Sequence, residues 1–145
     1  MSRILLTAVF FFFLFSACTN EEGNKPEVQA SENDLDAARN FIRAALDRNW
    51  REAKKYMLAD SANVERLEKI ETFYEHEDRE ERRGYREASI NTYDARKVSD
   101  SITIVNYSNS YKNQRDSLKV VRVDGQWLVD LKYSFLPPDS MRHVP

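Results

Sequence analysis

The chain has 145 residues, with 22 Lys plus Arg against 24 Asp plus Glu, so its positive and negative charges nearly cancel. This balance argues against a nucleic-acid-binding protein, which concentrates basic residues in a patch or stripe. With 3 Gly and 4 Pro, the chain is neither collagen-like nor low in complexity. Its length fits one domain, and its single Cys has no partner for an internal disulfide.

Residues 1–17 have the pattern of an export signal. Arg3 gives a positive start, and residues 4–15 form an apolar run of 12 that only Thr7 interrupts. A helix needs about 20 apolar residues to cross a membrane, whereas the core of a signal peptide has roughly 7–15. Ser16 and Ala17 follow, with the small side chains that a signal peptidase requires. We therefore leave these residues out of the fold.

Residues 14–18, LFSAC, resemble the lipobox of bacterial lipoproteins, in which the cysteine becomes the first mature residue. The resemblance implies that the Cys18 sulfur carries a diacylglycerol through a thioether and that the new amino group takes a third acyl chain. Phe15 departs from the pattern, which usually has Leu at that position. The alternative is an ordinary signal peptide cleaved after Ala17. Lipidation, unlike that alternative, explains why an exported protein keeps one unpaired cysteine.

Residues 18–33 are polar and predict a flexible tether that holds the domain away from the lipid. Glu21 and Glu22 resemble the acidic signal that sends some Gram-negative lipoproteins to the cell exterior. Thr19 is not the Asp associated with retention in the inner membrane. We therefore expect an outer-membrane lipoprotein, on either the periplasmic or the exterior face, with its membrane contact made through the lipid on Cys18.

Helical periodicity begins after the tether. Residues 34–49 predict a helix with one buried stripe, in which Asn33 or Asp34 caps the start and Asn49 ends the helix. The apolar residues of the stripe are Leu35, Ala38, Phe41, Ile42, Ala45 and Leu46.

Two further helices are expected before the strands. The second is short and carries Trp50, Ala53, Tyr56 and Met57 on one side. The third begins after residues 60–61, and its apolar stripe stops at Tyr74. Residues 75–83 are charged all round, which predicts a solvated helix end that Gly84 terminates.

From Tyr85 onward the apolar period becomes two, which is typical of strands. Ile102 and Ile104 are expected on one face of a strand, with Val105 and Tyr107 on the other. The pair at 124–125, Asp-Gly, lies between two alternating runs and predicts a two-residue type I′ hairpin turn. The turn sets the pairs as Val123–Gln126, Arg122–Trp127, Val121–Leu128, Val120–Val129, Lys119–Asp130 and Leu118–Leu131.

The predicted fold class is α+β, with three N-terminal helices packed on a curved antiparallel sheet of about four strands. The run AALDRNWREAKKYM and the ending VDGQWLVDL resemble the opening and the closing hairpin of nuclear-transport-factor-2-like domains, including those of secreted bacterial lipoproteins. The resemblance covers residues 34–134 and implies a cone, with a pocket between sheet and helices. Residues 135–145 are expected to be an irregular tail.

That resemblance implies isomerases and dehydratases among its members, which set a buried Asp or His against tyrosines. Asp94 beside Tyr93 is the candidate proton carrier in this chain, and an exposed strand aspartate is the alternative. His76 lies in the charged run and His143 in the tail, which favours solvated side chains. No metal-ligand spacing, phosphate loop or nucleophile motif is present, so we expect neither a metal nor a cofactor.

Aromatic residues on the predicted strands either line the cone or fill its core. The candidates for lining a ligand are Tyr93, Tyr107, Trp127 and Tyr133. Asp-Ser followed by an apolar residue occurs four times and resembles the serine O-glycosylation acceptor of some Gram-negative envelope proteins. The alternative is turn and cap chemistry. The four serines are Ser61, Ser101, Ser117 and Ser140.

The sequence thus favours a lipid-anchored envelope protein whose domain is a non-catalytic binding or accessory module. Its partner would be a small molecule, a peptide or another envelope protein, and not a nucleic acid. The alternatives are a small isomerase- or dehydratase-type enzyme that uses a pocket Asp or Tyr, and a purely structural envelope protein.

Overall fold

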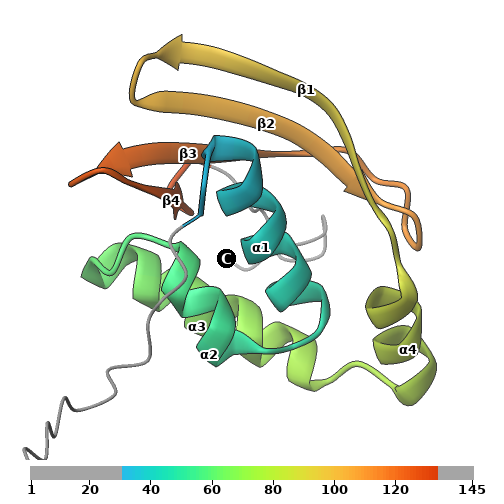
Figure 1. Cartoon of the computed structure of the whole chain (residues 1–145). Helices are drawn as coiled ribbons and strands as arrows, with labels where there is room; N and C mark the ends of the chain where they lie inside the picture. The colour runs from blue at the N-terminus through green and yellow to red at the C-terminus, as the bar shows by residue number, and fades with distance from the viewer. Residues whose placement is uncertain (1–30, 134–145) are drawn as a thin grey trace, which may run out of the picture.

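A computed structural model describes residues 31–133, and Figure 1 shows how its elements are arranged. The predictions for the signal, Cys18, Ser140, His143 and the tail fall outside these residues. Four α-helices precede a four-stranded antiparallel sheet, so the α+β prediction is confirmed. The elements are α1 (Asp34–Leu46), α2 (Trp50–Ala53), the 3₁₀ helix η1 (Lys54–Tyr56), α3 (Ser61–Glu75), α4 (Arg79–Glu87), β1 (Ile90–Ser99), β2 (Ile102–Asn109), β3 (Asp116–Val123) and β4 (Gln126–Asp130).

The sheet is a meander in the order β1-β2-β3-β4, and it curves over the helices (Figure 1). β-Bulges in β1, near Tyr93 and near Val98, increase the local bend and twist of this strand. Beyond β4, Met57 forms a parallel bridge with Val129, and the Leu58 N–H donates to the Val129 carbonyl at 2.9 Å. The chain after η1 therefore covers the edge of β4.

The β3–β4 hairpin has the predicted register. Asp124 and Gly125 have φ angles of 50° and 82°, as a type I′ turn requires at both central positions. The ladder pairs run from Val123–Gln126 to Lys119–Asp130, and each matches the sequence prediction. Leu118 and Leu131 are both fully buried, but β4 ends at Asp130, so their predicted pair lies outside the ladder.

Helix α1 packs against all four strands and supplies much of the core. Ala37 and Ala38 let its backbone approach the sheet, while Phe41 and Ile42 fill the space beside them. The sheet contributes alternate residues from its inner face. These buried strand residues are Val105, Tyr107, Leu118, Val120 and Val129.

Each α-helix begins at an Asn or Asp whose side chain accepts a backbone N–H three residues later. These caps are Asn33, Asn49, Asp60 and Asp78. The cap at Asn33 confirms one of the two residues predicted for the start of α1. The prediction that Asn49 ends α1 was wrong, because α1 ends at Leu46 and Asn49 starts α2. Arg48, with φ of 59°, takes the left-handed conformation in its place.

The prediction of a third helix running to Gly84 was also wrong. Asp78 caps a separate helix, α4, and Gly84 lies inside it. A Cβ on Gly84 would lie 2.3 Å from the Tyr111 ring, so the glycine makes room for an aromatic side chain from the β2–β3 loop. Among the helices of residues 31–133, none combines the length and apolar character needed to cross a membrane.

Replacing Gly84 tests this contact. In the native chain, Gly84→Ala should lower the free energy of unfolding by about 1–3 kcal/mol, because the added methyl group displaces the Tyr111 ring. In a Tyr111→Ala background, the same substitution should raise it by up to about 1 kcal/mol, since Ala favours a helix over Gly. Urea denaturation of the four proteins measures both effects, and an equal effect in the two backgrounds would contradict the contact.

Candidate functional site

Tyr93 and Asp94 lie on the outer face of the sheet, away from the helices. Asp94 pairs with Asn106, whose neighbour on the opposite face is the core residue Val105. Tyr93 is the extra residue of a bulge, is 50% exposed, and places its hydroxyl 2.7 Å from the Ser108 hydroxyl. The two residues are therefore neighbours, but on a solvent-facing surface of β1.

The other predicted lining residues are spread over the domain. Tyr107 pairs with Asp116 at one end of β3, whereas Trp127 pairs with Arg122 near the other end. Six residues of strand separate these pairs by about 20 Å, so the two rings do not border one small pocket. Tyr107 is buried in the core and Trp127 packs at its margin, while Tyr133 is 54% exposed.

A different group of side chains meets at the end of the domain where the α1–α2 turn and the start of α2 contact α3 and α4. The guanidinium of Arg48 lies 3.9 Å from the ring centre of Tyr74, 4.8 Å from that of Tyr85 and 5.9 Å from that of Trp50. Arg48 also forms an ion pair with Glu77. We call these five residues the Arg48 cage.

The local backbone explains why the Arg48 cage forms. The left-handed conformation at Arg48 reverses the chain after α1, and the Asn49 cap then starts α2 with Trp50. Glu77 follows the end of α3, where the chain turns toward the Asp78 cap of α4. The α1–α2 turn, the start of α2, the end of α3 and α4 thus supply the cage. Periodicity within single helices does not reveal such a group.

Burial sets the protonation of the Arg48 cage. It raises the pKa of Glu77, while the hydrogen bond and the charge of Arg48 oppose that rise. Burial also raises the pKa of Tyr74 and Tyr85, so both hydroxyls keep their protons at neutral pH. The Arg48 guanidinium is held by Glu77, by the Ala45 carbonyl and by the ring faces. The cage therefore neutralises its own charges and joins three helices.

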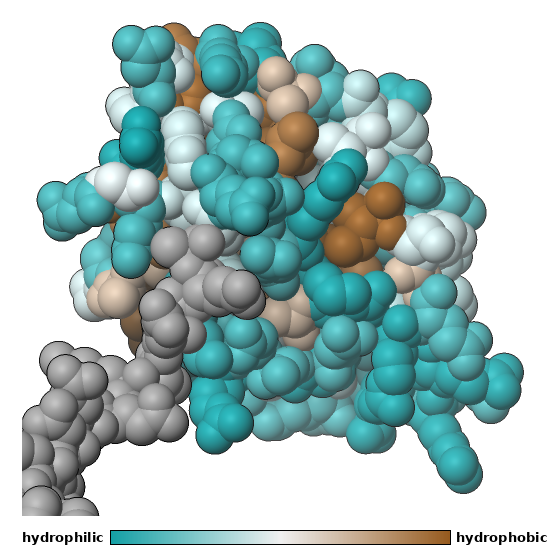
Figure 2. Space-filling view, in the orientation of Figure 1, coloured by the Kyte–Doolittle hydropathy of each residue, from teal (hydrophilic) through white to brown (hydrophobic). Residues whose placement is uncertain are grey.

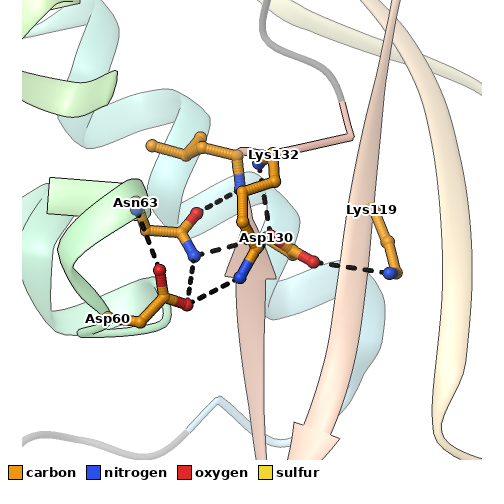
Figure 3. Close-up of polar contacts among 6 residues, drawn as sticks. Asp60, Asn63, Lys119, Asp130 and Lys132 are labelled. Atoms are coloured by element: carbon orange, nitrogen blue, oxygen red, sulfur yellow. Dashed lines mark hydrogen bonds and ion pairs between the residues drawn. The ribbon is translucent and has the colours of Figure 1, made fainter. Parts of the chain in front are cut away.

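A second polar group joins the start of α3 to the end of β4, as Figure 3 shows. Asn63 is fully buried, and its side-chain oxygen accepts the Leu131 N–H at 2.6 Å. Its amide nitrogen donates to Asp60 at 2.8 Å and to Asp130 at 3.4 Å. Lys132 contacts Asp60 at 2.7 Å. We call this group, with Lys119, the Asn63 clamp.

The charges of the Asn63 clamp are balanced within it. Lys119 lies 3.3 Å from one oxygen of Asp130, and Lys132 lies 3.6 Å from the other. The hydrogen bond from Lys132, followed by those from Asn63, lowers the pKa of Asp60 to about 2. A carboxylate held ionised in this way is a weak base, so the clamp suits a structural role better than proton transfer.

The remaining predicted residues occupy the surface. His76 is exposed at the end of α3, with its Nδ1 3.1 Å from the Thr72 carbonyl oxygen. Within residues 31–133, no group of His, Cys, Asp and Glu gathers closely enough to hold a metal ion. Ser61 and Ser101 are exposed, whereas the half-buried Ser117 donates its hydroxyl to Asn106 at 2.6 Å. Glycosylation stays a prediction for these serines.

Comparisons with known proteins found no match. No family model fits the chain, and no curated protein or solved structure is detectably similar to it.

Sequence reasoning predicted the Lys119–Asp130 pair, but neither the Arg48 cage nor the rest of the Asn63 clamp. Asn63 is a polar residue on the buried side of α3, one position before Val64 in the apolar stripe. Arg48 lies two residues before Trp50, at a predicted helix break. Both residues are polar and lie beside apolar ones in the sequence, which could have marked them as buried. Their partners could not be predicted, because they lie far along the chain.

Removing the Asn63 side chain tests the clamp. Asn63→Ala should lower the free energy of unfolding by about 2–4 kcal/mol, because it leaves the buried Leu131 N–H without a partner and Asp130 with one fewer donor. Glu65→Ala on the same helix is the control. It breaks only an exposed pair with Lys69 and should cost less than about 1 kcal/mol. Similar costs for the two variants would contradict the role of the clamp.

The stability that the clamp contributes should fall as the pH falls. The folded pKa of Asp60, about 2, lies below its ordinary value of 3.8, so the folded protein binds fewer protons at this group than the unfolded chain. The resulting stabilisation is complete above the ordinary pKa and is lost as the pH falls toward the folded value. Between about pH 4 and pH 2, stability should therefore fall more steeply in the native chain than in Asp60→Asn, which keeps a capping oxygen. Urea titrations at fixed pH measure both slopes, and equal slopes would contradict this assignment.

Proposed function

We propose that this protein is a lipid-anchored lipoprotein of the outer membrane of a Gram-negative cell. The observation that carries the proposal is the run of residues 4–18, in which a short apolar core and two small residues lead into the only Cys of the chain. Two or more acyl chains give stable anchoring, so the lipid on Cys18 suffices to hold the domain at the membrane. Residues 18–33 act as the tether between lipid and domain.

The domain serves as a non-catalytic binding or accessory module within a nuclear-transport-factor-2-like cone. The curved meander with helices beneath it is compatible with such a cone (Figure 1). The Arg48 cage lies at one end of the domain, where the α1–α2 turn meets α3 and α4. Arg48 covers the aromatic faces and is itself paired with Glu77, so the cage holds the helices of such a module in place and is not suited to proton transfer.

The enzyme alternative has less support from the positions of its candidate residues. A general base needs a tuned pKa and a place within reach of a bound substrate. Asp94 and Tyr93 lie on the solvent side of the sheet. Inside the domain, Glu77 is held by Arg48, and the Tyr107 hydroxyl donates to Asp116 at 3.5 Å. These contacts favour binding over catalysis.

Lipidation is tested by growth with labelled palmitate in a Gram-negative host. The native chain should incorporate the label, and Cys18→Ala should incorporate none, because the thioether needs the sulfur atom. Ser16→Ala is the control, since it keeps a small residue before the cysteine and should label normally. If Cys18→Ala took up as much label as the native chain, the lipid-anchored function would be refuted.

A further inference from the structure

One face of α4 carries only arginine. Residues 79–87 read REERRGYRE, and the four arginines occur with the spacing i, i+3, i+4 and i+7. This spacing places them in a single row along a helix. All four are exposed, and together with Glu80 they border a surface hollow of about 650 Å³. We call them the arginine row: Arg79, Arg82, Arg83 and Arg86.

The opposite face of α4 is fixed to the domain. Tyr85 is buried, Gly84 lies against the Tyr111 ring, and Glu81 pairs with Lys112 at 3.4 Å. Because this packed face lies on the other side of the helix, the arginine row points outward. Figure 2 shows strongly hydrophilic side chains projecting at the lower right, where Figure 1 places α4.

Arg43 of α1 holds the end of α4. Its guanidinium donates to the carbonyl oxygens of Ala88 at 2.8 Å and Arg86 at 3.1 Å, and it is itself held by Asp47 at 2.8 Å. These contacts satisfy carbonyl groups that a helix end otherwise leaves without donors. The arginine row is therefore presented on a rigid helix, and its orientation is set by the core helix α1.

The row is locally cationic in a chain whose formal net charge is −2. Among residues 31–133, the one ion pair of the row joins Arg83 to the exposed Glu80 at 2.9 Å, and such surface pairs are weak. Arginine binds phosphate groups through its fork of N–H donors, and several cations on one helix face favour an anionic membrane surface. Residues 79–87 carry no exposed apolar side chain for insertion, so contact with lipid would be electrostatic.

We propose that the arginine row binds the anionic phosphate headgroups of the membrane to which the chain is tethered. This inference rests on the proposed lipid anchor, which supplies proximity. Fifteen residues separate Cys18 from Asp34 and can span at most about 50 Å. Helix α1 places α4 about 20 Å from the point where the tether joins the domain, which is within that reach. The tethered domain therefore lies with α4 against the headgroups.

The experiment uses lipidated mature protein in vesicles. Because the only native cysteine, Cys18, carries lipid, an introduced cysteine is the only free thiol and can be labelled selectively. A fluorophore is attached to Glu87→Cys on α4 or, as a control, to Glu68→Cys on α3. Vesicles contain phosphatidylcholine alone or with 30% phosphatidylglycerol (about one anionic lipid in three), plus a lipid-borne quencher. The Glu87 label should be quenched in the anionic vesicles only, and 0.5 M salt should abolish the quenching, because it shortens the screening length to about 4–5 Å. The Glu68 label should not respond.

Two charge variants distinguish binding by the arginine row from a general attraction between the positive charges of the domain and the anionic vesicles. Arg79→Gln, Arg83→Gln and Arg86→Gln together should abolish the quenching, while Arg82 is kept because its Nε donates to the Glu77 carbonyl at 3.1 Å. The matched variant, with Arg51, Lys54 and Arg66 changed to Gln, removes the same charge elsewhere and should behave as the native chain does. Circular dichroism confirms that both variants are folded.

Two results would overturn the proposal. One is a Glu87 label that stays unquenched in anionic vesicles, as expected if the row binds an acidic protein partner. The other is equal quenching in the two charge variants. Flotation of the protein with neutral vesicles in high salt reports the lipid anchor alone, so its failure would count against the proposed function and not against the arginine row.

Discussion

The packing of α1 against the sheet is the contact on which the rest of the domain depends. Ala37 and Ala38 bring the helix backbone close to the strands, and Phe41 fills the space between them. The helix touches every strand, so the apolar area buried here is the main favourable term in folding. Its polar side is used as well, because Asp34 accepts the buried Thr103 hydroxyl at 2.6 Å and Arg43 holds α4.

Charged and polar groups join elements of the fold at places where apolar packing alone does not. The Asn63 clamp ties the start of α3 to the last strand, and the Arg48 cage joins the α1–α2 turn to α3 and α4. In both, a buried or half-buried charge has an opposite charge or a hydrogen-bond donor in contact, which is the condition under which such burial is tolerated. The interior charges thus serve the fold, while the arginine row of α4 faces outward.

The proposed lipid anchor and tether, together with the arginine row, would give the domain a preferred orientation at a surface. Acyl chains alone would fix the chain to the membrane but leave the domain free to rotate about its tether. A rigid helix with one cationic face adds direction, because it favours one side of the domain facing the headgroups. The outer face of the sheet, with Tyr93 and Asp94, would then remain accessible to a partner.

Much of the fold could be predicted because local patterns carry it. The Asp-Gly turn required positive φ at two successive positions, and this fixed the hairpin register to the residue. The caps at Asn33 and Asp60 mark helix starts by side-chain chemistry alone. Gly84 was predicted to end a helix, but it lies inside α4. The glycine is needed for a contact with Tyr111, which lies 27 positions later in the sequence, so local pattern does not reveal its role.

By itself, the sequence determined the α+β class, the register of the β3–β4 hairpin and the start of each early helix, since turn and cap chemistry act within a few residues. It also contains the lipobox-like run, although the attachment of lipid there stays a proposal. Only the tertiary structure decided that Arg48 meets Tyr85, that Asn63 meets Leu131, and that Asp94 faces solvent. Those outcomes depend on which face each element turns toward the core, and that choice is made by the packing of all the elements together.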